Sequence, residues 1–480
     1  MRVNAPIGMN SSSSRMLTAA RSVTVMLLLC AAAPVSFGAE YIGAGGLLPP
    51  GTELGDDAPD RPREVFRSET RGGRQTYLGV LGDIAFNSPS ILGPVARQAG
   101  ISCNTCHVNG ASNPRLFIPG LATRPGTFDT TGALFNPKAD NGVLDALTTP
   151  SLRGAHLLAP YGHDGRTSSL GEFVRNVIVE EFGGAEPSRE IMDALVMYIE
   201  DIDFVPNRRL TAGGGLQEPT TPSERRGEAL FHKPFPRDPQ MSCAGCHIPS
   251  AAFVDHRQHD VGTGGEFKTP TLRNANFNGP YFHDGRYRSY AQVVAYFDRV
   301  FYLGLTADDR KDLVAYLEAV GDGEQGLVAD DADAHLSEIT RFGTVLDTAL
   351  AEHNAVVAAL TVDTIDRELR ELSECYPERK DPTVSGGVEE RSAARGALKQ
   401  RVLELRVIDR YLRDGNFTAA TADLARLHAS LAQMVPVLQA AEPWSLFNRQ
   451  VHDAHFAALR KLNLRAIDPA SVTRPRVDVD

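Results

Sequence analysis

The pentapeptides CNTCH (Cys103–His107) and CAGCH (Cys243–His247) decide the fold of this chain. The spacing C-x-x-C-H is the attachment signature of a c-type haem. Two intervening residues let both thiols reach one edge of the planar macrocycle, and the adjoining His supplies one axial nitrogen to the iron. We therefore expect two covalently bound haem c groups, with His107 and His247 as axial iron ligands. The expected attachment residues are Cys103, Cys106, Cys243 and Cys246.

A structural zinc site built from the two Cys pairs is the alternative interpretation. Zinc ribbons usually place their Cys pairs much closer together in the sequence than these two pairs are, and they need no His after each pair. Cys375 is left over and is predicted to be a lone, buried or half-buried thiol. The cysteine pattern therefore favours haem over zinc.

A longer motif repeats after each pentapeptide. The first copy is TPSLRGAHLLAPYGHDGR (Thr149–Arg166) and the second is TPTLRNANFNGPYFHDGR (Thr269–Arg286), identical at more than half of their positions without a gap. Each copy leads to an amphipathic segment, Ile191–Ile202 in the first and Arg310–Gly321 in the second, whose apolar spacing predicts a closing helix. Self-similarity of this kind indicates a duplicated domain. An insertion at Asn109–Asp145, rich in Gly, Pro, Asn and Asp, predicts a loop in the first copy.

These motifs together resemble those of the bacterial di-haem cytochrome c peroxidase and MauG family. Arg225–Phe231 is similar to the family's opening helix, Ala251–Gly264 to its loop over the haem edge, and Phe267–Arg286 to its signature. The resemblance spans about residues 75–322. It implies two cytochrome-c-like helical domains that face each other, with a cation, often calcium, between them near Asn278.

The chain departs from the family pattern at several positions. His163 stands where the first unit of the family usually has a Trp between the haems, and Phe297 stands where the peroxidases have a Met that closes the second haem. The distal Gln and Glu of the family have no clear counterpart after Arg166. The far faces of the two irons therefore decide which chemistry the chain can perform.

The predicted fold is mainly α, with two cytochrome-c-like haem domains in tandem followed by a C-terminal helical bundle. Residues 39–215 form the first haem c domain, 216–324 the second, and 325–480 a bundle of unknown role. The bundle is expected to have about four helices. The helical patterns are His335–Leu360, Thr364–Cys375, Ala394–Arg413 and Ala419–Leu438, with a break at Asp381–Gly387.

The N-terminus has the layout of a secretory signal peptide at residues 1–38. Basic residues precede an apolar run from Val23 to Ala33, which is shorter than a membrane span, and small residues follow near Gly38. We expect an exported, periplasmic protein without a stable membrane span. The net charge of −11 argues against nucleic acid as a partner and would suit a basic redox partner. The expected donor is a small cytochrome, a cupredoxin or a quinol.

Several polar residues are expected near the haems. The near-haem candidates are His156, His163, Arg166, His259, His283 and Arg286. His163 and His283 share the frame P-Y-x-H-D-G-R, where a role at the propionates or the domain interface competes with iron ligation. Arg166 and Arg286, like Arg153, suit propionate pairing because a guanidinium forks onto a carboxylate, and the alternative is a salt bridge with the neighbouring Asp.

The sixth iron ligand is left open by the sequence. Further candidates are Met192 and Met197 for the first haem, and His256 and Tyr296 for the second. Strong ligation on both faces favours electron transfer, whereas an open face admits peroxide or dioxygen. Glu180 and Glu181 are the nearest carboxylates for acid–base work on peroxide, and exposed surface acids are the alternative. No catalytic residue is assigned.

The leading functional hypothesis is an exported di-haem c-type oxidoreductase of the peroxidase type. Electrons would pass between two covalent haems, and peroxide would be reduced at one of them. The alternatives are a non-catalytic di-haem electron-transfer cytochrome and a di-haem oxygenase that acts on an organic substrate.

Overall fold

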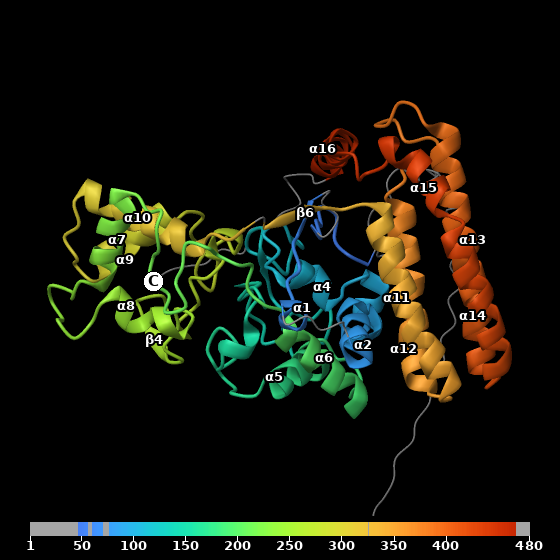
Figure 1. Ribbon diagram of the computed structural model, residues 1–480, viewed down its shortest axis with the longest axis horizontal. Coiled ribbons are helices and arrows are strands. Elements are labelled where there is room, and N and C mark those ends of the chain that lie inside the picture. The colour runs from blue at the N-terminus through green and yellow to red at the C-terminus, as the bar shows by residue number, and fades with distance from the viewer. Residues whose placement is uncertain (1–46, 56–59, 71–75, 325, 467–480) are drawn as a thin grey trace, which may run out of the picture. The chain divides into compact units, whose positions relative to one another are not determined.

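The computed structural model describes residues 47–55, 60–70, 76–324 and 326–466 (Figure 1). The signal peptide expected at 1–38 lies outside these residues. The described part is mainly helical, as predicted, and its strands form short antiparallel two-stranded ladders. The ladders pair β1 (Asp60–Pro62) with β6 (Leu327–Ala329), β2 (Thr127–Phe128) with β3 (Leu147–Thr148), and β4 (Gln258–Asp260) with β5 (Glu266–Lys268).

We call the two repeated parts of the chain the first and second haem units, after the haem that the sequence predicts for each. The helices of the first haem unit flank a long stretch with little regular structure. They are α1 (Arg67–Thr70), α2 (Tyr77–Asn87), α3 (Pro94–Ala99), α4 (Cys103–Cys106), α5 (Leu170–Asn176), the π-helix η4 (Val177–Glu181) and α6 (Arg189–Asp201). Residues 111–154 contain only the β2–β3 ladder and isolated bridges. This confirms the loop predicted for the insertion, because Gly, Pro, Asn and Asp favour turns over helices.

The second haem unit repeats the plan of the first. Its helices are α7 (Pro222–His232), α8 (Cys243–Cys246), α9 (Tyr290–Val300) and α10 (Ala307–Gly321). The two long motifs fold alike in detail. Tyr161 Oη donates to the Ala155 carbonyl oxygen at 3.2 Å, and Tyr281 Oη donates to that of Ala275 at the same distance. The repeat in the sequence is therefore a repeat in structure.

A glycine lies at the helix crossing of each haem unit. A Cβ on Gly82 of α2 would lie 2.2 Å from the carbonyl oxygen of Ala194 on α6. A Cβ on Gly227 of α7 would lie 2.0 Å from that of Asp312 on α10. Both distances are far below van der Waals contact, so only Gly allows the helices to approach this closely. The close crossing brings the closing helix of each unit onto its opening helix.

The C-terminal bundle differs from the prediction in where its helices begin and end. Its helices are α11 (Ala332–Ala351), α12 (Ala355–Glu374), α13 (Val388–Arg413), α14 (Phe417–Ala432), α15 (Val435–Ala441) and α16 (Arg449–Ala466). The first break lies at Glu352–Asn354 rather than near Leu360, because Asn354 caps α12 by accepting from Val357 N. The predicted break at Asp381–Gly387 is confirmed. None of the described helices is long and apolar enough to cross a membrane.

The bundle shares a hydrophobic core with the first haem unit. Leu81 and Ile84 of α2 and Ala194 of α6 belong to the same buried cluster as Ile339 and Phe342 of α11. The α2 helix contacts both α11 and α12. The bundle therefore packs directly on the helices that carry the first haem unit, and it is not an isolated appendage.

Candidate functional site

The first C-x-x-C-H forms one closed helical turn. Ser102 is the N-cap residue of α4, and Thr105 Oγ1 accepts from Ser102 N at 3.2 Å. The N–H of His107 donates to the Cys103 carbonyl oxygen at 2.9 Å and ends the turn. The turn therefore fixes the spacing between the two thiols and the imidazole.

Pro150 orients the imidazole of His107. The Nδ1 atom lies 2.8 Å from the Pro150 carbonyl oxygen, which can only accept, so Nδ1 carries the proton and Nε2 keeps its lone pair. Metal-ligating His residues almost always donate their other ring N–H in this way. Burial lowers the pKa of His107 to about 4, which keeps the ring in the neutral form that binds metal.

The second unit has the same arrangement. The N–H of His247 donates to the Cys243 carbonyl oxygen at 2.9 Å, and its Nδ1 lies 3.2 Å from the carbonyl oxygen of Phe253. Burial lowers the pKa of His247, although the hydrogen bond to the Phe253 carbonyl oxygen opposes this shift. Both predicted axial ligands are therefore held by backbone carbonyls with Nε2 left for a metal.

Cys103, Cys243, Cys246 and Cys375 are free thiols in the described structure. Burial raises the pKa of Cys103 to about 12 and that of Cys243 to about 11, so both sulfurs are protonated at neutral pH. None of these cysteines forms a disulfide within the described residues. The thiols of Cys103, Cys243 and Cys246 are thus available for thioether bonds.

Arg153 provides a separate test of whether a haem fits. The side chain is 1% exposed, and its Nη2 donates to the Arg63 carbonyl oxygen at 2.7 Å. Its Nε and Nη1 atoms are buried without a hydrogen-bond partner among the described residues. Burial lowers the pKa of this guanidinium to about 10. A buried half-paired cation three residues from Pro150 fits an anionic group such as a haem propionate.

The two long motifs are joined by reciprocal hydrogen bonds. The Lys268 N–H donates to the carbonyl oxygen of His163 at 2.9 Å, and the Thr148 N–H donates to that of His283 at 2.7 Å. Thr148 and Lys268 each precede a T-P-x-L-R, so the two contacts are equivalent in the repeat. The ammonium of Lys268 also donates to the carbonyl oxygens of Leu158 and Pro160, both at 2.6 Å. The units therefore face each other through their repeated motifs.

The His residues of the long motifs lie at this junction. His163 Nε2 lies 2.8 Å from the Thr148 carbonyl oxygen, and burial lowers the His163 pKa. The ring of His283 stacks on Phe267 of β5, with centroids 3.7 Å apart. The backbone carbonyls of both residues make the hydrogen bonds across the junction, and the roles of the two imidazoles stay predictions. His156 lies in the short helix η3 (Ala155–Leu157).

The candidate arginines form ion pairs in both units. Arg286 binds Asp284 through two nitrogens at 2.8 to 2.9 Å. Arg166 lies 3.4 Å from Asp164 and 2.7 Å from Glu181, and its guanidinium lies 4.9 Å from the centre of the Phe173 ring. Both arginines therefore form the salt bridge of the alternative interpretation, propionate pairing stays a prediction, and Glu181 of η4 is an additional partner of Arg166.

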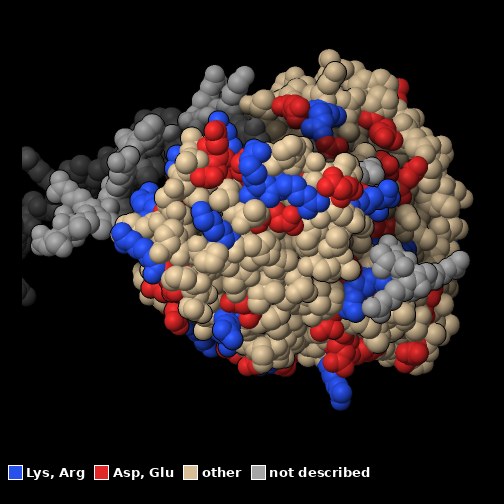
Figure 2. Space-filling model, turned by 60° about the vertical axis from the view of Figure 1, so that its left-hand side comes forward, with Lys and Arg blue, Asp and Glu red and all other residues tan. Residues whose placement is uncertain are grey.

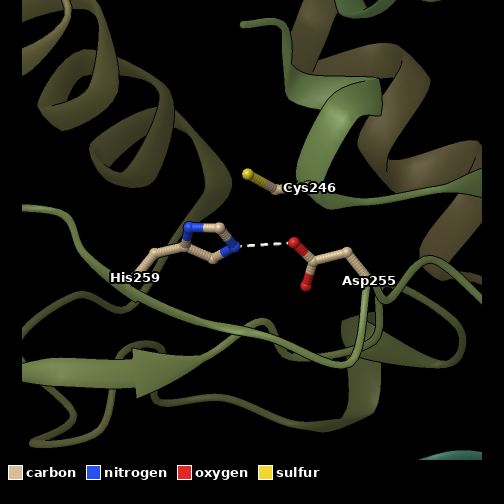
Figure 3. A group of neighbouring side chains, drawn as sticks. All are labelled: Cys246, Asp255 and His259. Atoms are coloured by element: carbon tan, nitrogen blue, oxygen red, sulfur yellow. Dashed lines mark hydrogen bonds and ion pairs between the residues drawn. The ribbon is translucent and has the colours of Figure 1, made fainter.

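Cys246, Asp255 and His259 lie together beside the second motif (Figure 3). Their possible ligand atoms all lie within 4.8 Å of one another, and His259 Nε2 is 2.6 Å from Asp255 Oδ2. Burial opposes ionisation of Asp255, but the hydrogen bonds from His259 and Thr269 outweigh it and lower its pKa. If Cys246 carries a haem thioether, the His259–Asp255 pair lies at that haem edge. Sequence reasoning named His259 but missed Asp255.

The candidate far-side ligands of the second haem are engaged elsewhere. Tyr296 Oη donates to the Val261 carbonyl oxygen at 2.8 Å, and His256 Nδ1 lies 2.7 Å from that of Ala159 in the first unit. Phe297 stacks on Phe301 with centroids 5.8 Å apart. In the first unit, Met192 and Met197 lie on α6, and Met192 packs against the core of that unit.

The structure also brings together buried acids that the sequence did not single out. Asp83 of α2 is 2% exposed, and Glu64 and Glu338 lie partly buried near it. Asp83 is the only acid within the largely apolar α2. A carboxylate at a core-facing helix position was the signal available in the sequence.

Comparisons with known proteins find similarity to di-haem cytochrome c peroxidases and MauG proteins. The family described as di-haem cytochrome c peroxidase matches residues 223–315. Hydrazine synthase subunit gamma of Kuenenia stuttgartiensis is 25% identical over 328 residues, which cover 56% of this chain and 84% of that protein. The methylamine utilization protein MauG of Methylophilus methylotrophus is 23% identical over 288 residues, covering 48% and 79%. Cytochrome-c peroxidase IdrP1 of Denitromonas iodatirespirans is 38% identical over 78 residues, covering 14% and 20%.

Proposed function

Since residues 223–315 match the family described as di-haem cytochrome c peroxidase, we propose that the chain is an exported di-haem oxidoreductase that reduces peroxide at its first haem unit. The proposed domains are residues 39–215 and 216–324 for the two haems and 325–480 for the bundle. Cys103, Cys106, Cys243 and Cys246 would bind the haems covalently, with His107 and His247 as axial ligands. Calcium between the units, and a small cytochrome, cupredoxin or quinol as donor, complete the proposal.

The junction between the repeats supports electron transfer between the two units. Pro150 accepts from His107 Nδ1, and Thr148, two residues before it, donates to the carbonyl oxygen of His283. Covalent and hydrogen bonds thus connect the axial ligand of the first unit to the signature motif of the second. Reduction of one peroxide to two waters consumes two electrons and two protons. A chain with two haems can hold both electrons, one on each haem.

The pair of Arg166 and Glu181 is the single observation that favours the first unit for peroxide chemistry. A bound haem would supply the iron that reacts with peroxide and receives the electrons. Glu181 can accept a proton from one peroxide oxygen and return it to the other, as a general acid–base group does. Its side chain is 15% exposed, and Arg166 holds its carboxylate at 2.7 Å. The corresponding Arg286 is paired with the adjacent Asp284.

The surface has a mixed charge on the face that Figure 2 shows. Lys and Arg side chains are interspersed there with Asp and Glu over the described residues. Docking of a donor on this face would therefore rest on local pairs of charges more than on one field of a single sign.

Peroxide turnover by the purified holoprotein tests this proposal. Replacing Glu181 by Gln keeps the shape of the side chain and removes its base, and we expect peroxide turnover to fall by 10²-fold or more. Glu186→Gln, an exposed partner of Arg175, is the matched control and should keep full activity. The electron paramagnetic resonance spectrum of the ferric protein should show one high-spin and one low-spin haem.

Two results would separate the alternatives. Two low-spin ferric haems that bind no cyanide and turn over no peroxide would make the chain an electron carrier. Rapid peroxide reduction that is equal in wild type and Glu181→Gln would remove Glu181 from the chemistry.

A further inference from the structure

A group of buried and partly buried charged side chains lies where the bundle meets the first haem unit. The α2 helix of that unit packs there against α6 and against the bundle helices α11 and α12 (Figure 1). At its centre are three carboxyls, which we call the acid triad: Glu64, Asp83 and Glu338. Glu64 precedes α1, Asp83 lies on α2, and Glu338 comes from the bundle helix α11.

Direct contacts bind the acid triad to its surroundings. Arg341 of α11 forms an ion pair with Asp83, and Asn87 Nδ2 donates to Asp83 Oδ1 at 2.9 Å. Tyr198 Oη of α6 donates to Glu64 Oε1 at 3.2 Å. The bundle thus supplies both Glu338 and the main counter-charge, Arg341.

The acid triad carries more negative charge than its neighbours balance. Arg341 is the cation paired with it, whereas the next cation, Arg61, is already paired with Asp330 at 2.9 Å. The other charged and titratable groups that face the acid triad or its partners are Tyr198, Arg153, Asp330, His335, Glu368 and Cys375. Three ionised carboxylates beside one paired Arg would leave uncompensated buried charge, which is costly.

Desolvation therefore shifts the protonation of these acids towards neutral pH. Burial raises the pKa of Glu64, Asp83 and Glu338 to about 7 each, and Arg341 only partly offsets this effect. Glu64 and Glu338 keep partial solvent access, so protons can reach the group from water. Protons on the acid triad can thus exchange in the physiological pH range.

The spacing of the acid triad fits protons and does not fit a metal ion. Within the described residues, the trio of potential ligands whose atoms all lie within 4.8 Å of one another is Cys246, Asp255 and His259. The three carboxyls are therefore too far apart to share one cation. Tyr198 and Arg341 lie among them instead.

Arg153 connects the acid triad to the haem side of the first unit. Its guanidinium interacts electrostatically with Glu64, and its Nη2 donates to the carbonyl oxygen of Arg63, the residue before Glu64. Its Nε and Nη1 atoms are buried without partners in the described structure. Arg153 therefore interacts with the acid triad and has two N–H groups left for an anionic haem edge, so a charge added to a haem bound there would change the field at Glu64.

We propose that the acid triad is a proton-binding site that takes up one proton from water when the first haem accepts one electron from the donor. A haem held by His107 would supply the iron that takes the electron, and the proton would form an O–H bond on a carboxylate of the acid triad, so the buried region would gain no net charge. This inference rests on the proposed function, because it needs a haem at His107. It assigns the bundle a role in redox chemistry, since Glu338 and Arg341 belong to α11.

Spectroelectrochemical titration of the holoprotein at a series of pH values tests the proposal. We expect the midpoint potential of one haem to fall with rising pH between about pH 6 and 8, by up to ~59 mV for each tenfold change in proton concentration in a one-electron couple. Glu338→Gln removes a negative charge and should move this window to lower pH. Arg341→Gln removes the positive charge and should move it to higher pH. Asp347→Asn, an exposed acid on the same helix, should leave the window in place.

Opposite shifts in the two variants would not arise from a loss of packing, which would affect both alike. Infrared difference spectra give a second readout. The reduced-minus-oxidised spectrum should show a protonated carboxyl band that Glu338→Gln alters and Asp347→Asn does not. Two haems whose potentials are independent of pH, or a window unmoved by both variants, would overturn the proton-binding site and leave the proposed function intact. A protein without covalent haem would overturn both.

Discussion

The backbone N–H of Thr148 donates to the carbonyl oxygen of His283, and Lys268 repeats this contact in reverse on His163. The motif that defines each haem unit is thereby also the surface on which the other unit rests. Because equivalent residues make equivalent contacts, the junction has local pseudo-twofold character. Duplication of one domain has produced both the two haem motifs and the contact between them.

Loss of one attachment motif should remove one haem. We expect a variant with Cys243→Ala and Cys246→Ala to bind one covalent haem per chain instead of two, measured as the pyridine haemochrome against protein concentration. Cys375→Ser is the control, because this lone thiol lies outside both motifs, and it should retain both haems. Two haems in the double variant would show that Cys243 and Cys246 do not attach one.

Alanine at either crossing glycine should destabilise the protein. The new Cβ of Gly82→Ala would lie 2.2 Å from a carbonyl oxygen, and that of Gly227→Ala would lie 2.0 Å from another. Overpacking that forces two helices apart typically lowers the free energy of unfolding by about 1–3 kcal/mol. Gly396→Ala in the exposed middle of α13, where a Cβ meets nothing within 4 Å, should be neutral or stabilising by up to about 1 kcal/mol. Urea unfolding of the three variants measures the difference.

Stability should fall as the pH rises through the range in which the acid triad ionises. Its carboxyls have folded-state pKa values raised to about 7, above those of an unfolded chain, so the folded state binds more protons between about pH 4.5 and 7. The stabilisation that these bound protons give the folded state is fully present below that pH range and is lost above it. The loss for the coupled group is on the order of 3 kcal/mol.

Unfolding in urea at pH 5 and pH 8 measures this dependence. Glu338→Gln should reduce the difference between the two pH values, because one of the groups that must ionise is gone. Asp347→Asn should not change it. An equal pH dependence in all three proteins would place its origin outside the acid triad.

Removing the ammonium of Lys268 should weaken the junction between the haem units. Its Nζ donates to two carbonyl oxygens, and Lys268→Met leaves both without that donor. We expect a loss of about 1–3 kcal/mol of unfolding free energy. Lys311→Met, whose side chain is 78% exposed, should change stability by less than about 0.5 kcal/mol. Calorimetry of both variants distinguishes a junction contact from a general effect of charge.

Short-range patterns accounted for much of the fold. The amphipathic spacing of Ile191–Ile202 and Arg310–Gly321 predicted the helices α6 and α10, and the capping box at Thr221 begins α7. Helices of this kind can be predicted because the hydrophobic period and the cap residues are local properties. The boundary between α11 and α12 was placed wrongly, because the apolar helical pattern resumes directly after the short polar segment Glu352–Asn354 and only the Asn354 cap marks the turn.

Contacts between distant segments could not be predicted. Glu64 interacts with Glu338, and Asp83 pairs with Arg341, across the surface that the bundle covers. Each pair depends on which faces pack together, and neither has a signature in residue spacing. The docking of the bundle on α2 was missed for the same reason, since an amphipathic face does not identify its partner.

The C-x-x-C-H pentapeptides and the repeat around them are properties of the sequence alone, because haem attachment needs only the spacing of three side chains on one helical turn. The sequence by itself therefore determined the expectation of two haem units in a mainly helical chain. Only the tertiary structure decided that Pro150 and Phe253 orient the two imidazoles, that Glu181 lies on Arg166, and that the bundle inserts Glu338 and Arg341 beside Asp83. These contacts depend on how helices and loops far apart in the chain pack, and the pKa of a carboxyl follows from the burial and charges that packing creates.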